Sequence, residues 1–257
     1  MTTKKIFICC TEQSGENICF NIIKNLDLNS IQIDGVCGKN SEKYFTNKFF
    51  DISEFKSIGI VEIILSLKKN INMIKFLNTK IIHGNYDLVI CIDSPDFNYN
   101  LVKSLRKNKC SNYILQIVAP TVWAWREKRA QKFAKIYNEI FVLFNFEHKY
   151  FQFPNFKCTF IGHPIFHINK RIKKNDCKYI SFLFGSRENE INKLFFYFDI
   201  LEKHIFKNNP QYKIFIPTLP HLIDKIKLKT KKWKTETLIT TSSLQSEKCY
   251  DDVCISI

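Results

Sequence analysis

The sequence alternates short apolar runs with segments of helical pattern, and this alternation constrains the fold more than any other feature. The run "YDLVICID" (Tyr86–Asp93) shows the character of the apolar segments best, because nearly every position in it is apolar. Such a run is typical of a strand in a parallel sheet that helices cover on both faces. We therefore predict an α/β fold built from strand–helix–strand units.

The alternation occurs twice, and a polar, basic stretch separates the two series. The pattern predicts two Rossmann-like parallel-sheet units, the second incomplete: an N-terminal domain over 1–167, a linker over 168–178 and a partial C-terminal domain over 179–257. The predicted strands are Lys4–Cys10, Ile31–Gly38, Tyr86–Asp93, Asn112–Pro120, Glu139–Phe144, Cys158–Pro164, Tyr179–Gly185, Tyr212–Thr218, Thr237–Thr241 and Val253–Ile257. The predicted helices include Gly59–Leu77, Asn98–Lys107, Glu127–Lys135, Glu147–Phe153, Glu188–Phe206 and His221–Lys229. The last apolar run, Val253–Ile257, is typical of a buried strand.

Charge and cysteine content narrow the classes of function. The chain carries 39 Lys and Arg against 24 Asp and Glu, a net charge of +15, which suits an anionic partner such as nucleic acid, anionic lipid or a phosphorylated substrate. The lysines are spread along the chain without an Arg-rich or Gly-rich block, so biased composition is the main cause and a nucleic-acid groove is disfavoured. Ten cysteines without a C-x-x-C pair predict reduced thiols, a cytoplasmic location and no metal site. No apolar run is long enough to cross a membrane or to form a signal peptide.

Four polar clusters follow predicted strands, where open parallel sheets bind their ligands. They are Thr11–Glu16, Asp93–Asn98, Ala119–Arg129 and Gly185–Glu190. A carboxylate that ends a buried strand, such as Asp93, is partly shielded from water and suits a general base. An Asp that merely forms the turn before Ser94–Pro95 explains the same letters equally well.

The cluster Gly185–Ser186–Arg187 precedes a predicted helix. Backbone N–H groups and an arginine at that position would hold a phosphate. An ordinary helix start with Ser186 as its cap is the competing interpretation, and the cluster alone favours it.

The helix predicted over Gly59–Leu77 carries an apolar stripe with lysines beside it. The stripe includes Ile60, Ile63, Ile64 and Leu67, and Lys68 and Lys69 follow. Packing against the protein core is the usual explanation of such a stripe. Insertion of the stripe into a membrane surface, with the lysines on anionic headgroups, is the alternative.

Read together and in order, these clusters resemble one enzyme family, the lipid-A-disaccharide synthases, which are inverting glycosyltransferases of the GT-B class. The matching words are "TEQSGE", "GIVEIILSL", "DLVICIDSPDFN", "APTVWAWREKR", "FIGHP" and "GSRENEI". "SPDFN" with "VWAWR" is the most specific pair, and the resemblance covers Lys5 to about Ile257. Family chains continue beyond this point into a nucleotide-binding loop, so the resemblance implies a C-terminally truncated member.

The resemblance implies the following reaction. UDP-2,3-diacylglucosamine and 2,3-diacylglucosamine 1-phosphate (lipid X) give lipid A disaccharide 1-phosphate and UDP, without a cofactor or a metal. Asp93 matches the family's candidate base, and Glu12 and Ser14 match its first-loop active-site residues. Gly185, Ser186 and Arg187 match the region that binds the donor diphosphate. No role follows for Trp123 or Trp125 of "VWAWR".

The resemblance also implies partners and a location. The acylated substrates make Ile60, Ile63, Ile64, Leu67, Lys68 and Lys69 a predicted contact with an anionic membrane. The expected location is cytoplasmic and peripheral, on the inner membrane of a Gram-negative-type bacterium. A non-catalytic remnant that still binds lipid or membrane is the alternative function, no nucleic acid is expected, and a homo-oligomer stays open.

Overall fold

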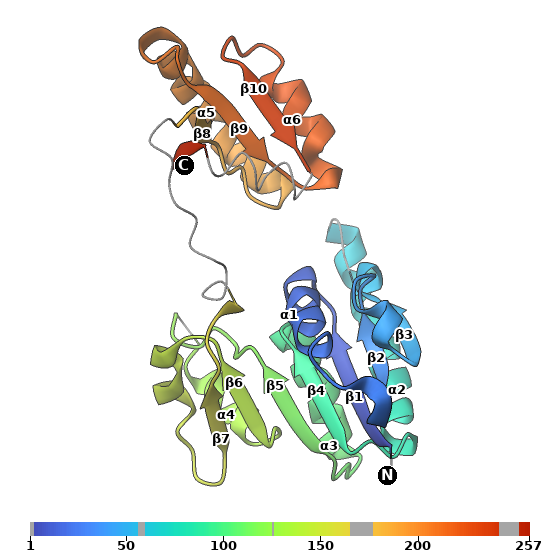
Figure 1. Ribbon diagram of the computed structural model, residues 1–257. Helices are drawn as coiled ribbons and strands as arrows, with labels where there is room; N and C mark the ends of the chain where they lie inside the picture. The colour runs from blue at the N-terminus through green and yellow to red at the C-terminus, as the bar shows by residue number, and fades with distance from the viewer. Residues whose placement is uncertain (1–2, 56–59, 125, 165–176, 242–251) are drawn as a thin grey trace. The chain divides into compact units, whose positions relative to one another are not determined.

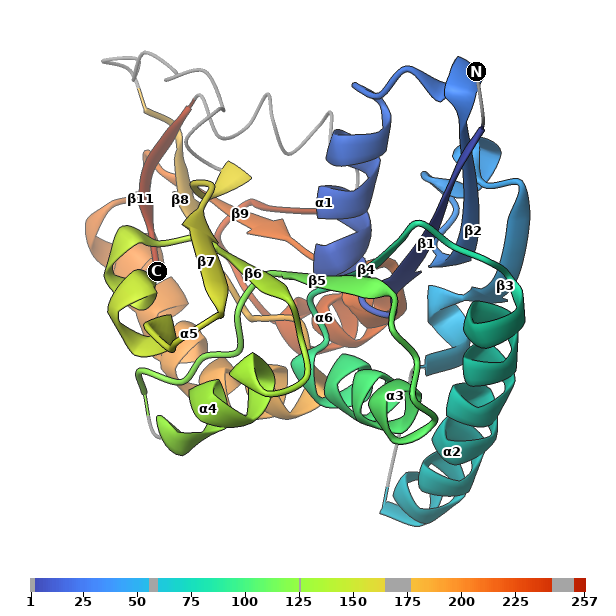
Figure 2. The same ribbon diagram turned by 90° about the horizontal axis from the view of Figure 1, so that it is seen from below.

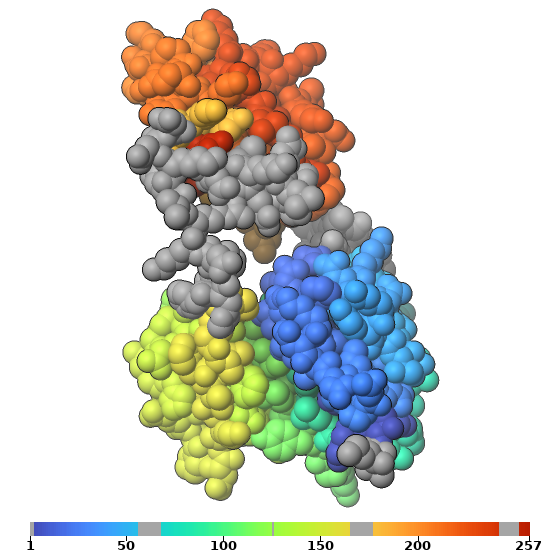
Figure 3. Space-filling view, in the orientation of Figure 1, coloured from blue at the N-terminus to red at the C-terminus, as the bar shows by residue number. Residues whose placement is uncertain are grey.

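A computed structural model describes residues 3–55, 60–124, 126–164, 177–241 and 252–257, without the side chains of 60–67. The chain divides into two compact units, Met1–Ile168 and Asn169–Ile257 (Figure 1). Figure 3 shows the outer surface of each unit in a space-filling view, coloured along the chain. Most of the predicted linker, 168–178, lies outside the described residues.

A seven-stranded parallel sheet forms the centre of the first unit, in the order β3-β2-β1-β4-β5-β6-β7. The strands are β1 (Lys4–Cys10), β2 (Ile31–Cys37), β3 (Asn47–Asp51), β4 (Leu88–Ile92), β5 (Tyr113–Ile117), β6 (Glu139–Val142) and β7 (Lys157–Phe160). The parallel sheet predicted from the sequence is thereby confirmed. The sequence pattern missed β3, because this edge strand has only two apolar residues, Phe49 and Phe50, next to each other.

Helices cover both faces of this sheet. Figure 2 shows α1 (Gln13–Ile23) on one face and α2 (Ile60–His83), α3 (Pro95–Lys107) and α4 (Lys128–Ala134) on the other. Short 3-10 helices η1 (Leu28–Ser30), η2 (Glu42–Tyr44), η3 (Ile52–Phe55) and η4 (Asn145–Phe151) complete the unit. Two predicted helices need correction. The helix predicted from Asn98 begins at Pro95, which is favoured in a first turn, and the one predicted over Glu147–Phe153 is η4.

The core of the first unit follows the alternation of side chains along its central strands. Phe7 and Cys9 of β1 pack in the layer that holds α2, α3 and α4, whereas Ile8 and Cys10 pack with α1. All four are at most 2% exposed. A strand whose two faces are both buried must be apolar at every position, and this explains the continuous apolar runs of the sequence.

A smaller parallel sheet forms the second unit, in the order β10-β9-β8-β11. Its elements are β8 (Tyr179–Ser181), α5 (Glu188–Asn208), β9 (Lys213–Pro217), η6 (Pro220–Leu222), α6 (Ile223–Thr230), β10 (Thr237–Thr240) and β11 (Val253–Ser256). Phe182 and Phe198 stack at the centre of its core, with ring centroids 4.5 Å apart. The prediction of a buried strand over Val253–Ile257 is wrong, because β11 pairs with β8 at the sheet edge and leaves Ile255 55% exposed.

Within the described residues, every helix is too short or too polar to cross a bilayer.

Candidate functional site

Two of the predicted site residues meet at the carboxyl edge of the first sheet. β1 and β4 are parallel neighbours, with Cys10 opposite Ile92, so the segments that follow them start side by side. Ser14 lies in the first turn of α1 and donates a hydrogen bond from Oγ to Oδ2 of Asp93, which follows β4. Gly15 permits this approach, since a Cβ there would stand 3.0 Å from the Ile92 carbonyl oxygen and 3.2 Å from the Asp93 Cβ.

The backbone at Asp93 is held in an unusual conformation. Asp93 and Ser94 both lie in the left-handed region, with φ of 55° and 43°. Consecutive residues of this kind are costly outside glycine and persist only where neighbours fix them. The Asp93 carbonyl oxygen accepts hydrogen bonds from Asn98 Nδ2 at 2.8 Å and from Gln116 Nε2 at 3.1 Å. These two amides are the fixing groups.

Gln116 and Asn98 are the functional residues that the sequence analysis missed. Both side chains are fully buried. Gln116 also donates to the carbonyl oxygen of Val118 at 3.1 Å, and Val118 itself has a φ of 70°. One buried amide thus ties the strained ends of β4 and β5 together. The available signal was a glutamine inside the apolar strand "YILQI", because a buried polar side chain must find partners.

Glu12 is the N-terminal cap residue of α1, two positions before Ser14. It lines a pocket of about 590 Å³ together with Thr11, Ser94 and Asp96. The apolar part of its lining comes from η3, α2 and α3; it consists of Phe55, Ile71, Ile74, Pro95 and Phe97. The pocket therefore combines carboxylates with an apolar wall, which suits a ligand that has a polar and an apolar part.

Glu16 has a structural task within the same cluster. It is 1% exposed, and its carboxylate accepts hydrogen bonds from the backbone N–H groups of Gly38 at 2.7 Å and Ser41 at 2.9 Å. These bonds tie α1 to the loop that follows β2. Glu16 therefore stabilises the position of the first turn of α1, where Ser14 lies.

The stretch "VWAWR" follows β5 at the same edge. Trp123 is 47% exposed and packs edge-on against Phe146, with ring centroids 5.5 Å apart. Trp125 lies outside the described residues. Arg126, Lys128, Arg129 and Lys132 line a second pocket, which shares Asp96 and Asn100 with the first. The sequence analysis placed this cluster at the ligand edge, but it assigned no role to these cations.

The predicted phosphate site of the second unit is internally bonded. Gly185 has a φ of 86°, and the helix cap of α5 is Arg187, so the prediction that Ser186 caps this helix is wrong. The carboxylate of Glu190 accepts hydrogen bonds from the N–H groups of Ser186 at 2.7 Å and Arg187 at 3.1 Å. It also pairs with the Arg187 guanidinium at 2.9 Å. The donors expected to hold a phosphate thus contact a carboxylate, and their role toward a nucleotide stays a prediction.

The predicted membrane contact is described only in part, because the side chains of Ile60, Ile63, Ile64 and Leu67 lie outside the described residues. Lys68 and Lys69 are exposed and line a shallow groove with Phe50 and Phe76. Ile71 and Phe76 on the same helix are 53% and 42% exposed. Among the described residues, no group of three His, Cys, Asp or Glu side chains is placed to hold a metal ion.

The two parallel-sheet units and the strand-end site define an α/β protein of the GT-B type. Among solved structures, the chain is similar to the UDP-GlcNAc 2-epimerase from Neisseria meningitidis bound to UDP-GlcNAc, with a TM-score of 0.63 and 12% identity. The match covers 99% of this chain and 77% of that one. It is also similar to MurG of Acinetobacter baumannii, with a TM-score of 0.56, 11% identity and coverage of 98% and 72%. At such identities the likeness shows the fold alone.

The chain belongs to the lipid-A-disaccharide synthetase family, whose model matches residues 6–253. It is 35% identical over 226 residues to the lipid-A-disaccharide synthase of Rickettsia typhi, and 37% identical over 226 residues to that of Rickettsia akari. These matches cover 83% and 82% of this chain. The chain spans 60% and 57% of the length of these two relatives.

Proposed function

We propose that this chain acts as a glycosyltransferase in lipid A biosynthesis, joining UDP-2,3-diacylglucosamine to 2,3-diacylglucosamine 1-phosphate. The products are the lipid A disaccharide 1-phosphate and UDP. The observation that carries the proposal is the hydrogen bond between Ser14 and Asp93, which brings together two residues that the family resemblance had named from separate segments.

In the proposed mechanism, Asp93 is the general base. It takes the proton of the acceptor's 6-hydroxyl while that oxygen forms a bond to the anomeric carbon of the donor sugar. The bond between this carbon and the UDP oxygen breaks, and UDP leaves with the electron pair. Ser14 orients the Asp93 carboxylate through its hydrogen bond. Glu12 contacts the acceptor from the pocket that it lines with Thr11 and Ser94, the residue after Asp93.

Gly185, Ser186 and Arg187 are proposed to bind the diphosphate of the donor. The Arg187 guanidinium would offset the negative charge that develops on the leaving UDP. In the structure this guanidinium pairs with Glu190. Binding of the diphosphate therefore requires Arg187 to exchange one anionic partner for another.

A membrane role accompanies the proposal, because the substrates carry acyl chains. We infer that the chain lies on the cytoplasmic face of the inner membrane, with Lys68 and Lys69 on anionic headgroups and Ile71 and Phe76 at the acyl boundary. Liposome sedimentation tests this with Lys68→Glu plus Lys69→Glu. Lys203→Glu plus Lys207→Glu, on exposed lysines of α5, is the matched control. Equal partitioning of the two variants would contradict the membrane surface.

A transfer assay with purified protein tests the activity itself. Radiolabelled donor and lipid X should give a labelled disaccharide that depends on both substrates. The full-length Rickettsia typhi relative serves as the positive control under identical conditions. If the relative forms disaccharide and this chain forms none while still binding lipid X, the chain is a lipid-binding protein and the proposed activity is refuted.

A further inference from the structure

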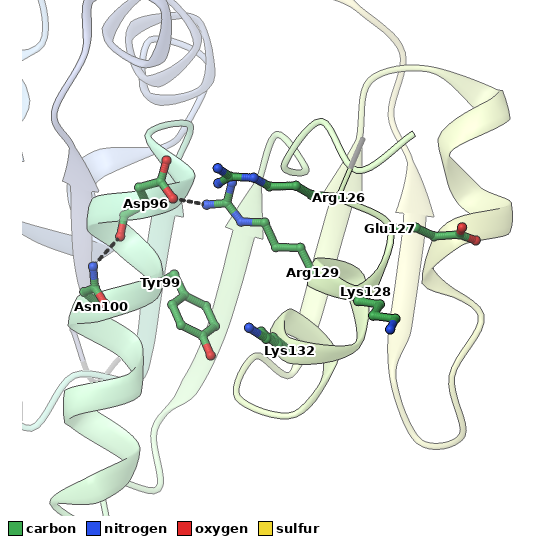
Figure 4. A pocket seen from close by; sticks show the side chains of 8 residues that line it. All are labelled: Asp96, Tyr99, Asn100, Arg126, Glu127, Lys128, Arg129 and Lys132. Carbon is green, nitrogen blue, oxygen red and sulfur yellow. Dashed lines mark hydrogen bonds and ion pairs between the residues drawn. The ribbon is translucent and has the colours of Figure 1, made fainter. Parts of the chain in front are cut away.

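A basic pocket of about 660 Å³ lies between α3 and the segment that leads into α4 (Figure 4). Its cations are Arg126, Lys128, Arg129 and Lys132, and Asp96, Tyr99, Asn100 and Glu127 complete its lining. Figure 4 shows the Glu127 side chain pointing away from this group. Asp96 is then the one carboxylate among the eight lining residues that lies beside the Arg126 and Arg129 guanidinium groups.

Arg129 is fixed in this pocket before any ligand binds. Its side chain is 19% exposed, and its guanidinium pairs with the Asp96 carboxylate. The same guanidinium lies over the Phe133 ring, 5.5 Å from the ring centre. A guanidinium held by a stack and an ion pair loses little further freedom on binding an anion, so it is a preorganised donor.

Arg126 and Lys132 bring further positive charge to this pocket, whose lining holds four cationic side chains and two carboxylates. Figure 4 shows the guanidinium groups of Arg126 and Arg129 side by side, both near Asp96, while the Lys132 ammonium points toward Tyr99. Neighbouring like charges repel, and an anion with several acceptor oxygens relieves that repulsion better than a single carboxylate can. A phosphate monoester has this chemistry.

The basic pocket is continuous with the candidate active site. Asp96 and Asn100 line both this pocket and the pocket that contains Glu12 and Ser94. One molecule can therefore contact the two pockets together. The apolar lining of the pocket that contains Glu12, which includes Ile71, Ile74 and Phe97, would lie against an acyl chain of the same molecule.

We propose that Arg126, Arg129 and Lys132 bind the phosphate ester of the lipid acceptor and thereby place the acceptor's hydroxyl at Asp93. This inference rests on the proposed function, because it takes the acceptor to be a phosphorylated glycolipid. A phosphate on a bilayer lipid has the same chemistry, and the experiment below separates the two sources.

The test compares two glycolipids in neutral detergent micelles, using the full chain and isothermal titration calorimetry. The probes are 2,3-diacylglucosamine 1-phosphate and the same lipid without its phosphate. The native chain should bind the phosphorylated lipid about tenfold more tightly, because hydrogen bonds to charged groups contribute more than neutral ones. Arg126→Ala plus Lys132→Ala, on two exposed side chains, should abolish this preference and leave binding of the unphosphorylated lipid unchanged.

A matched control removes the same amount of positive charge from α3 instead. Lys103→Ala plus Lys107→Ala takes two exposed lysines from the C-terminal half of that helix and should keep the full preference. Circular dichroism checks the fold of each variant. If the double variant at the pocket does not fold, the single change Lys132→Gln replaces it and should reduce the preference about threefold.

Several outcomes would overturn the proposal. If the native chain binds both glycolipids equally, it still binds the acceptor, but the basic pocket does not bind the acceptor's phosphate and the proposal is refuted. If the pocket variant loses both lipids to the same extent, its cations do not act on the phosphate. If the variant keeps its preference but no longer binds phosphatidylglycerol vesicles, the pocket binds bilayer phosphate instead. If neither glycolipid binds, the acceptor role of the proposed function fails as well.

Discussion

The two strand-to-helix turns that the sequence analysis identified as site candidates solve the same local problem in opposite ways. The turn at Asp93–Ser94 leads into α3 with two consecutive left-handed residues, fixed by the side-chain amides of Asn98 and Gln116. The turn at Gly185–Arg187 leads into α5 with glycine at its left-handed position. Glu190 then accepts hydrogen bonds from the N–H groups of Ser186 and Arg187. The first turn is strained, and hydrogen bonds from neighbouring side chains fix it. In the second turn, a carboxylate from the following helix accepts the hydrogen bonds of the turn's own N–H groups.

This difference separates two kinds of functional site. Strain that persists only because buried neighbours fix it marks a position where geometry is maintained for chemistry. A turn whose N–H groups already contact a carboxylate is a stable helix start, and it exchanges that carboxylate for a ligand only if the ligand is the better acceptor. In the proposed mechanism, Asp93 is therefore already held in place, whereas Arg187 must first leave Glu190.

The largest effect is expected at the strained turn itself. Asp93→Asn keeps the shape of the side chain but removes the proposed base, so the rate of disaccharide formation should fall by about a hundredfold or more. Asp87→Asn is the matched control, because Asp87 lies just before β4 and pairs there with Lys4. The radiolabelled transfer assay measures both. An Asp93→Asn variant as active as the control would end the assignment of Asp93.

The next effect is expected from the amide that fixes this turn. Gln116→Leu removes the donor to the carbonyl oxygens of Asp93, Ile117 and Val118 without opening a large cavity. The buried acceptors lose a partner, so the free energy of unfolding should fall by about 2 kcal/mol. Transfer should also fall at temperatures where the variant is fully folded, since Asp93 is no longer held.

Urea unfolding and the transfer assay separate these two losses. Gln13→Leu on the exposed face of α1 provides the control, because Gln13 is exposed and donates a 3.4 Å hydrogen bond to the exposed Asn17. A purely structural Gln116 would lower stability and leave the rate of the folded fraction unchanged. That result would remove Gln116 from the positioning of Asp93.

The sequence predicted the framework of the first site well, for physical reasons. A parallel strand buried on both faces is nearly all apolar, so β1 and β4 can be recognised in the sequence as apolar runs. Their carboxyl ends share an edge, and therefore the approach of Ser14 to Asp93 follows from topology. The fixing of Asp93 by Gln116 does not follow, because a side-chain amide bonds a backbone carbonyl oxygen 23 positions away, and no local pattern encodes that contact.

At the second turn, the helix cap was predicted incorrectly. The prediction of Ser186 as the cap rested on residue type alone. The spacing of Arg187 and Glu190, three positions apart, matched the back-bonding half of a capping box and pointed to Arg187. This spacing could therefore have been recognised in the sequence, but the general preference for serine at helix caps favoured Ser186 instead.

A moderate effect is expected when the second turn is made to resemble an open anion site. Glu190→Ala removes the carboxylate that accepts from Ser186 and Arg187, and the free energy of unfolding should fall by about 1 kcal/mol. The freed N–H groups and guanidinium should raise the affinity for UDP about threefold. Glu188→Ala is the control, since Glu188 lies in the same helical turn but pairs with Lys225. If UDP affinity falls in the Glu190 variant, the carboxylate supports the nucleotide site instead of competing for it.

The smallest effect is expected from labelling the buried thiols of β1 and β4, the strands that lead into the Ser14–Asp93 site. Burial raises the pKa of the Cys91 thiol to about 12 and the pKa of Cys10 above its usual range, so both stay protonated at pH 8. The thiolate is the reactive form, and iodoacetamide should therefore leave them almost unlabelled in the folded chain. Cys177 in the second unit is only half-buried and should label faster than Cys10 and Cys91. Peptide-resolved mass spectrometry measures the rates, with chain unfolded in guanidinium chloride as the reference in which all thiols react. Labelling of Cys91 at the rate of Cys177 would mean that the sheet beneath Asp93 opens readily. The hydrogen bonds from Asn98 and Gln116 would then be too weak to hold the turn at Asp93.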